Sequence, residues 1–194
     1  DIAPEISETT KVLKQISAAN APEVPLKSNF SKSLALNLCG YVPVVYAFGF
    51  YRSVAQRFKQ QFNENSKVPA KWEVFPELNH NEIVGWENHG TLTESFSAIL
   101  IRDQAEFSEL RSRIETTKKL MQPAVSKIFE VWVQGKSPLA KMLSTICIGD
   151  FTSVYLALLR KIDPTPVKTI AVLKEQVQQT GVKEKIIREL DKLS

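Results

Sequence analysis

The chain has 194 residues, of which 43% are hydrophobic and 24% are charged, proportions that are typical of a globular domain. A chain of this length is large enough for one hydrophobic core and too small for two. Its 25 Lys and Arg residues against 21 Asp and Glu residues give a net charge of +4, and the excess forms no basic stripe, which argues against nucleic-acid binding. Two cysteines, Cys39 and Cys147, are too few for a disulfide scaffold or a Cys-rich zinc module. Both lie in apolar runs, so we expect buried free thiols.

The start of the chain and its longest apolar run indicate where in the cell the protein is expected. The run over 34–50 is interrupted by Asn37, Gly40, Pro43 and Gly49. A membrane helix needs about 20 predominantly apolar residues, so we expect a helix end followed by a strand and no membrane segment. Residue 1 is Asp rather than Met and no signal-peptide pattern follows. We therefore expect a cytoplasmic chain that is a trimmed part of a longer one.

The first third of the chain predicts helices around one strand. Apolar residues at helical spacing predict a helix over 5–19, and a second helix over 29–39 is ended by Gly40. The continuous apolar run 43–49 predicts a strand buried on both faces. It leads into a helix that carries Val54, Phe58 and Phe62 on one stripe.

Strands and helices alternate in the middle of the chain. Further strands are predicted at 72–76, 96–101 and 128–133. A helix separates the last two strands, and its apolar stripe consists of Phe107, Leu110, Ile114 and Met121.

The last third of the chain is predicted to be helical. Ser137 and Pro138 are a typical N-cap and first-turn pair, and they open a long helix that reaches about Arg160. Two more helices are predicted at 167–178 and 182–192. Strands that alternate with helices of this length predict an α/β fold in three layers, with a mainly parallel sheet flanked by helices.

Ligands of open parallel sheets bind beyond the carboxyl ends of the strands. The segments that we expect at such strand ends, or just after them, are 49–53, 62–65, 76–82, 102–104 and 134–137.

The chain has two histidines, His80 and His89, and His80 follows the predicted 72–76 strand. His80 is either a loop histidine bonded to backbone or an acid/base group beyond a strand end. A metal site would combine both histidines with Glu82 and Glu87. These four residues lack the spacing of a helical HExxH motif and have no Cys partner, so we expect no metal.

Glu64 lies in the triplet 63–65, Asn-Glu-Asn, at a predicted helix end. It is either part of an ordinary polar cap or a general base, a role favoured by the negative end of the helix dipole. Lys174 is either a solvated lysine on an amphipathic helix or a site residue. Neither a glycine-rich phosphate loop nor a Gly-x-Ser-x-Gly elbow is present. The residues alone identify Glu64 and His80 as acid/base candidates.

Three stretches together resemble the bifunctional phosphoglucose/phosphomannose isomerases of the phosphoglucose isomerase superfamily. They are 57–67 around Asn-Glu-Asn, 76–82 with His-Asn-Glu, and 163–167 together with Leu173 and Lys174. The resemblance implies two sugar isomerase (SIS) domains, each flavodoxin-like. On this reading, residues 1–28 are a helix and linker that continue from an absent first SIS domain, and residues 29–194 are the carboxyl-terminal SIS domain.

The same resemblance assigns roles to individual residues. It implies that Glu64 is the catalytic base, that His80 opens the sugar ring, and that Lys174 is the active-site lysine. Thr165 is the nearest candidate for the family's turn threonine, which handles mannose 6-phosphate, although an ungapped alignment places Val167 there. At the strand-to-helix junction, Arg52 and Ser53 are candidates to hold an anion.

The implied activity is an aldose–ketose isomerisation. Glucose 6-phosphate or mannose 6-phosphate is interconverted with fructose 6-phosphate through a cis-enediol, without a cofactor, as in glycolysis and gluconeogenesis. Family members are homodimers in which the histidine reaches the neighbouring subunit, so we expect His80 near such an interface. The phosphate-binding loops belong to the absent first domain, so the isolated chain should turn over little substrate. The alternative is a non-catalytic SIS module that binds sugar phosphates or regulates.

Overall fold

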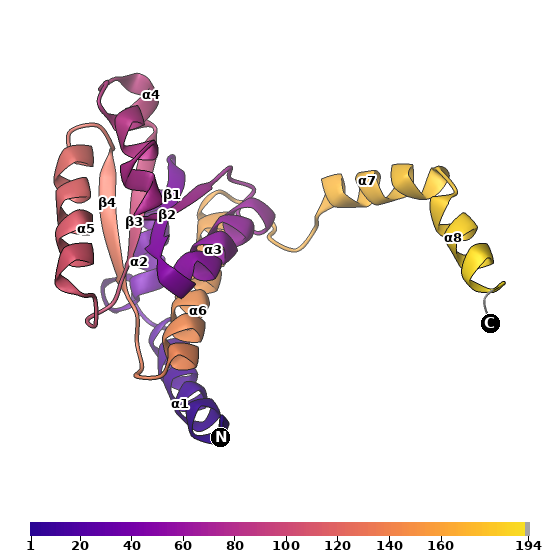
Figure 1. Ribbon diagram of the computed structural model, residues 1–194, viewed down its shortest axis with the longest axis horizontal. Coiled ribbons are helices and arrows are strands. Elements are labelled where there is room, and N and C mark those ends of the chain that lie inside the picture. Colours follow the sequence, from indigo (N-terminus) through magenta and orange to yellow (C-terminus); the bar gives the residue numbers. More distant parts are fainter. Residues whose placement is uncertain (193–194) are drawn as a thin grey trace. The chain divides into compact units, whose positions relative to one another are not determined.

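The computed structural model describes residues 1–192. The chain divides between Pro164 and Thr165 into two compact units. The first unit contains a sheet with helices on both faces, and the second contains two helices (Figure 1).

A four-stranded parallel sheet lies at the centre of the first unit. Its strands are β1 (Val42–Phe48), β2 (Lys71–Phe75), β3 (Phe96–Arg102) and β4 (Lys127–Trp132). Their order is β2-β1-β3-β4, and every pairing is parallel. This is the order of the first four strands of a flavodoxin-like sheet. The predicted α/β class, and all four predicted strands, are confirmed.

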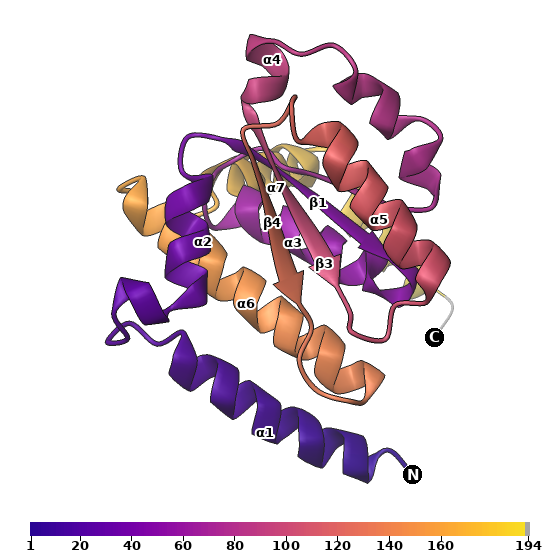
Figure 2. The same cartoon turned by 90° about the vertical axis from the view of Figure 1, so that its left-hand side faces the viewer.

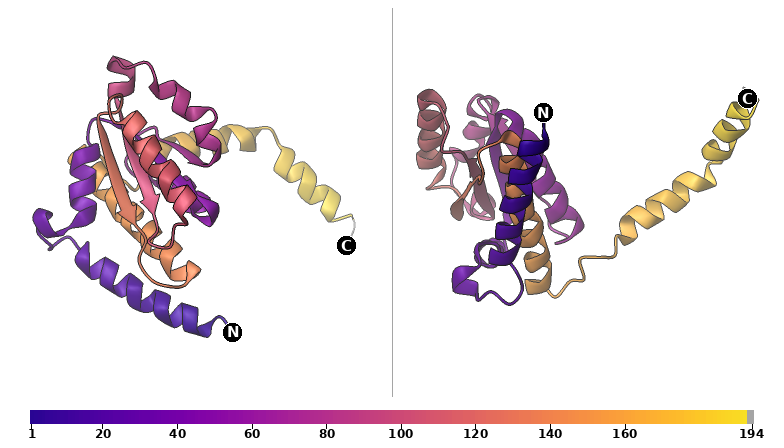
Figure 3. Two further views of the ribbon diagram at one scale, coloured as in Figure 1. Left: turned by 60° about the vertical axis from the view of Figure 1, so that its left-hand side comes forward. Right: turned by 90° about the horizontal axis from the view of Figure 1, so that it is seen from below.

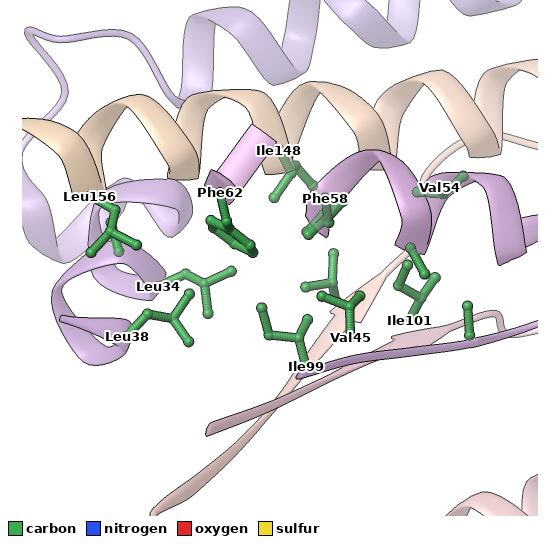
Figure 4. Close-up of a cluster of buried hydrophobic side chains, with 14 of the residues drawn as sticks. Leu34, Leu38, Val45, Val54, Phe58, Phe62, Ile99, Ile101, Ile148 and Leu156 are labelled. Atoms are coloured by element: carbon green, nitrogen blue, oxygen red, sulfur yellow. The ribbon is translucent and has the colours of Figure 1, made fainter. Parts of the chain in front are cut away.

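Three helices cover one face of the sheet: α2 (Phe30–Leu38), α3 (Arg52–Glu64) and α6 (Pro138–Leu159). Helix α1 (Ala3–Ala19) packs on the outer side of α6 (Figures 2 and 3). Phe58 and Phe62 of α3 meet Val45 of β1 and Ile99 of β3 in the core beneath these helices (Figure 4). The stripe predicted for α3 is therefore the stripe that faces the sheet.

The opposite face is covered by α5 (Ser108–Met121) and by the segment that joins β2 to β3. That segment forms two short 3-10 helices, η3 (Glu77–Asn79) and η4 (Glu82–Trp86), and the short helix α4 (Thr91–Glu94). Leu78 and Trp86 of these turns are buried with Leu110 and Ile114 of α5. Two more 3-10 helices, η1 (Leu26–Ser28) and η2 (Gly49–Tyr51), precede α2 and α3.

Within residues 1–192, α6 is the one helix that is long and apolar enough to cross a membrane by length and composition. Half of its most apolar window is buried, because α1, α2 and α3 all pack on it. A helix that is covered on several sides needs apolar residues on several sides. Gly149 lets α6 approach α3 closely, since a Cβ at this position would lie 2.4 Å from the Phe58 ring.

The expectation that both cysteines are buried is wrong for Cys39. Cys39 is exposed and Cys147 is half-buried, and both are free thiols. Helix α2 buries Leu34 and Leu38 and ends at Leu38. Cys39 therefore lies in the turn beyond the buried stripe, just before Gly40, whose φ of 93° reverses the chain direction.

The second unit contains α7 (Lys168–Gln179) and α8 (Val182–Leu190), which confirms the two predicted terminal helices. Gly181 separates them with a left-handed φ of 66°.

Candidate functional site

Glu64 is the last residue of α3, and it is exposed. The turn that follows is fastened to α6. The Asn65 Nδ2 donates to Ser153 Oγ at 2.9 Å, and the Ser66 hydroxyl donates to the Ser153 carbonyl at 2.6 Å. Because Ser153 is fully buried, the backbone around Glu64 is fixed while its carboxylate stays open to a ligand.

Lys67 joins this turn to the Pro-rich segment after α6. Its ammonium donates to the carbonyl of Glu64 at 2.5 Å and to the carbonyl of Pro164 at 3.0 Å. A cation at the carboxyl end of a helix also offsets the negative end of the dipole. The structure thus brings Glu64, of the first stretch that carries the family resemblance, close to Pro164, of the third. Thr165 follows Pro164 directly and is the first residue of the second unit.

Lys174 lies in the second unit, on α7, where it is exposed. Leu173 beside it is 63% exposed.

His80 follows β2 along the chain, in the segment that packs against α5, and this segment is anchored on both sides of His80. Before it, Asn79 Nδ2 donates to the Thr117 hydroxyl of α5 at 2.6 Å. After it, Glu82 accepts hydrogen bonds from Tyr46 of β1 at 3.0 Å and from Lys71 of β2. His80 itself is exposed on this anchored segment. It is therefore presented outward.

The groups of the rejected metal interpretation have other tasks. Glu82 accepts hydrogen bonds from Tyr46 and Lys71. Burial of the Tyr46 hydroxyl is the main reason why the pKa of Tyr46 lies above its ordinary value, and the negative charge of Glu82 raises this pKa further. Glu87 and His89 line a cavity of about 680 Å³ against α5. Across residues 1–192, no three His, Cys, Asp or Glu residues are grouped as a metal ion requires.

The structure does not bring Arg52 and Ser53 to Glu64. They begin α3 and Glu64 ends it, and 13 helical residues at about 1.5 Å per residue separate the two ends by about 18 Å. The Ser53 hydroxyl donates to the carbonyl of Phe50 at 2.9 Å, and Arg52 is exposed.

Glu64 and His80 also belong to segments that cover opposite faces of the sheet. Helix α3 starts after the carboxyl end of β1 and runs back on one face, so Glu64 lies near the start of β2, whereas His80 lies in the segment that covers the other face. The prediction that groups 62–65 with segments at the carboxyl ends of strands is wrong. The reason is topological, because a helix that connects two parallel strands must end at their amino edge.

A polar cluster lies at the carboxyl edge of the sheet, the edge at which α/β proteins bind ligands. Asp103 follows β3 directly and accepts hydrogen bonds from the Tyr51 hydroxyl at 2.5 Å and the Lys141 ammonium at 2.8 Å. Segment 102–104 is among the predicted strand ends, but the sequence assigns no role to Asp103. The sequence signal that could have identified Asp103 is a carboxylate directly after a strand. Its partners could not be identified in this way, because they come from two other elements.

A second carboxylate at this edge anchors α1. Glu8 accepts from the backbone N–H of Lys136 at 2.5 Å and of Ser137 at 3.1 Å, in the loop before α6. Gly135 in this loop has a φ of 103°, and a Cβ there would lie 2.6 Å from that of Ala140. Helix α1 is thus attached to the rest of the first unit by polar contacts as well as by its packing on α6.

Replacing Asp103 with Asn should lower the free energy of unfolding at pH 7 by about 1.5–3 kcal/mol, the usual range for hydrogen bonds to a charged group. Burial raises the pKa of Asp103, but hydrogen bonds from Lys141 and Tyr51 outweigh it and hold that pKa below its ordinary value. The contribution is therefore complete above the unfolded-state pKa, near 4, and is lost as the pH falls through the folded-state value. Urea unfolding between pH 7 and pH 2 should show a larger loss of stability in that acid range for the unaltered protein than for the Asn variant. Equal pH profiles for the two proteins would contradict this assignment.

Residues 27–177 match the family model for the bacterial phospho-glucose isomerase C-terminal SIS domain. The chain belongs to this family. It is 40% identical over 176 residues to the bifunctional phosphoglucose/phosphomannose isomerase of Caldicellulosiruptor bescii, a match that covers 90% of this chain and 52% of the relative. The same-named protein of Aquifex aeolicus is 37% identical over 148 residues, which cover 76% of this chain and 46% of the relative.

Solved structures agree with the fold. The crystal structure of a glucose-6-phosphate isomerase like protein from Thermus thermophilus superposes with a TM-score of 0.71 at 23% identity, over 82% of this chain and 53% of that one. This chain therefore spans about half the length of the relatives that it matches.

Proposed function

We propose that this chain is the carboxyl-terminal half of an aldose–ketose isomerase that interconverts glucose 6-phosphate or mannose 6-phosphate with fructose 6-phosphate. The observation that carries the proposal is Glu64, an exposed carboxylate on a turn braced by Ser153 and Lys67. It lies within the span matched to the isomerase family. A base that serves two adjacent carbons in turn needs a fixed backbone and an open side chain.

In the proposed reaction, Glu64 removes the proton from C2 of the open-chain aldose. The electrons of the C–H bond form the C1–C2 double bond while the C1 carbonyl oxygen gains a proton, which gives a cis-enediol. Glu64 then returns its proton to C1 while O2 loses its proton and becomes the carbonyl oxygen of the ketose. One carboxylate completes the cycle without a cofactor. Lys174 would stabilise negative charge on the oxygens, and Thr165 would contact the substrate at the turn that Lys67 holds.

His80 is proposed to move protons between the ring oxygen and O1 while the sugar ring opens. Since His80 and Glu64 belong to segments on opposite faces of one sheet, the proposal requires a homodimer in which His80 serves the neighbouring subunit's Glu64. The outward presentation of His80 by Asn79 and Glu82 supports such a role. We place the enzyme in the cytoplasm, as expected for sugar-phosphate metabolism.

The phosphate group is assigned to a first SIS domain that precedes residues 1–28, with residues 29–194 as the second. The relatives are about twice as long as this chain, which supports a preceding domain. Arg52 and Ser53 remain candidates for an anion at the other end of α3. Without the first domain, the chain by itself should show little turnover, because the binding energy of the phosphate positions C2 against the base. The alternative is a module that binds sugar phosphates and does not turn them over.

The two-domain protein supplied with glucose 6-phosphate in deuterated water should form fructose 6-phosphate that carries deuterium at C1. A carboxylate that holds the proton between C2 and C1 exchanges part of it with solvent, whereas a hydride shift does not. NMR of the product measures the label. Product without deuterium would contradict the proton-transfer route, and binding without product would favour the non-catalytic alternative.

A further inference from the structure

The two terminal helices, α7 and α8, carry a continuous set of uncovered apolar side chains. Every described residue from 165 to 192 is exposed. On α7 the apolar residues on one face are Ile170, Leu173 and Val177, and on α8 they are Val182, Ile186, Ile187 and Leu190. The exposed fractions of these seven side chains run from 37% for Ile170 to 63% for Leu173.

Helices of this length need a partner surface. Helix α7 has 12 residues and α8 has nine, and isolated helices shorter than about 12–15 residues are marginal in water. The spacing 170, 173, 177 and 182, 186, 190 places the apolar residues of each helix on a single stripe. Polar residues such as Lys185 and Arg188 lie on the other side of α8. This pattern is that of helices whose stripe is buried in the complete molecule.

The residue that precedes the helix pair, Pro164, indicates which part of the protein could cover the two helices. The pair follows Pro164, whose carbonyl is held by Lys67, and Lys67 also binds the carbonyl of Glu64. Pro164, the last residue of the first unit, therefore lies at the Glu64 edge of the sheet.

The lengths of the relatives indicate which domain could cover the two helices. The matching family model describes a carboxyl-terminal domain, and the relatives are about twice as long as this chain. They therefore contain about one further domain ahead of this region. In the proposed reaction that domain holds the phosphate while Glu64 acts on C2, so it must face the edge of the sheet at which Glu64 and Pro164 lie.

We propose that α7 and α8 form a clasp, defined by their seven stripe residues, that packs on the amino-terminal domain of the same polypeptide. The clasp ties the two domains together through the carboxyl-terminal end of the chain, in addition to the covalent link at its amino-terminal end. Lys174 borders the stripe, four residues after Ile170 and three before Val177. Packing of the clasp therefore also fixes Lys174, a consequence that rests on the proposed function.

Photo-cross-linking in the two-domain protein tests the clasp directly. A benzophenone amino acid in place of Ile186 should cross-link to peptides of the amino-terminal domain, and the same group in place of Lys185 on the polar side should not. Mixing isotope-labelled with unlabelled protein separates contacts within a chain from contacts between chains. Cross-links to residues 1–164, or to the second copy, would overturn the proposal, as would equal yields from the two positions.

Amide exchange supplies a second readout that does not depend on activity. The double substitution Ile186→Asp and Ile187→Asp should raise the exchange rates of the α8 amides at least tenfold, since charges on the stripe oppose burial. The matched control Lys185→Glu with Arg188→Glu, on the polar side, should leave them unchanged. Exchange that is already as fast in the unaltered protein as in the double variant would overturn the clasp. A lost clasp with unchanged kcat would uphold the packing and overturn the role of Lys174.

Discussion

Replacing Glu64 with Gln in the two-domain protein should lower kcat for glucose 6-phosphate isomerisation by roughly 10²–10⁴-fold, the range that general acid–base catalysis contributes. Gln keeps the volume of the side chain and its hydrogen-bonding capacity, but it cannot take a proton from C2. Because Glu64 is exposed at the end of α3, the folded structure should be preserved. The loss should therefore appear in kcat, with KM little changed, in steady-state kinetics.

The outcome that would contradict this assignment is a kcat within about tenfold of the unaltered enzyme, roughly 1.4 kcal/mol of barrier. The base would then be sought at Glu77 or Glu82. Of these, Glu82 is already bound to Tyr46 and Lys71, so it is less free to accept a proton. Sugar-phosphate binding measured on the Gln variant separates a lost base from a lost site.

His80→Ala provides a matched partner for the Gln variant. The loss of activity caused by His80→Ala should be smaller when open-chain substrate is supplied, because ring opening precedes isomerisation. If His80 acts on the neighbouring subunit, dimers that pair a Glu64→Gln chain with a His80→Ala chain contain one site with both native groups. Random pairing of two inactive proteins should then restore roughly a quarter of the native sites. No recovery in hybrid dimers of proven composition would show that the two groups do not meet across subunits.

The strands and the apolar stripes could be predicted from the sequence because each is a local pattern. The run 43–49 became β1 at Val42–Phe48, and the stripe with Phe58 and Phe62 faces the sheet. Gly40 marked the end of α2 for the same reason, since its left-handed φ requires glycine. The resemblance added Glu64 and the turn at 163–167, which the Lys67 contacts place side by side as far as Pro164.

What could not be predicted depends on which elements meet. Ser153 lies in an apolar helix, and only the packing of α6 against α3 makes it the anchor of the Glu64 turn. Likewise Asp103, Tyr51 and Lys141 come from three elements that no sequence spacing relates. The edge at which 62–65 lies follows from the direction of a helix between parallel strands, a fact of topology rather than of residue type.

Among the residues whose role depends on contacts between elements, Arg102 is the one that we expect to contribute most to stability. It ends β3 and its side chain is only 2% exposed, yet it carries a full charge in the core. Both oxygens of the buried Glu106 carboxylate accept from it at 2.8 Å, while Glu115 and Glu130 share its remaining nitrogen. Burial opposes the charge, but these carboxylates outweigh burial and raise the pKa of Arg102 above its ordinary value.

Arg102→Met should therefore lower the free energy of unfolding of this chain by about 3–5 kcal/mol, measured by urea denaturation at pH 7. The cost arises because the substitution leaves Glu106, which is fully buried, without its main counter-charge. Adding Glu106→Leu should recover much of the loss, since a buried pair replaced as a whole by apolar groups is often nearly neutral.

Arg57→Met is the matched control for this prediction, because Arg57 also makes a two-pronged contact with a carboxylate, at Asp150. That pair is 44% and 36% exposed, so its loss should cost only about 0–1 kcal/mol. The two substitutions remove the same chemical group from the same kind of partner, and they differ in burial. Equal losses for the two variants would mean that burial of Glu106 is not the source of the effect. A double variant no more stable than Arg102→Met would mean that the lost stability resides in the contacts with Glu115, Glu130 and the Trp132 ring, 4.8 Å from the guanidinium, and not in the stranded carboxylate.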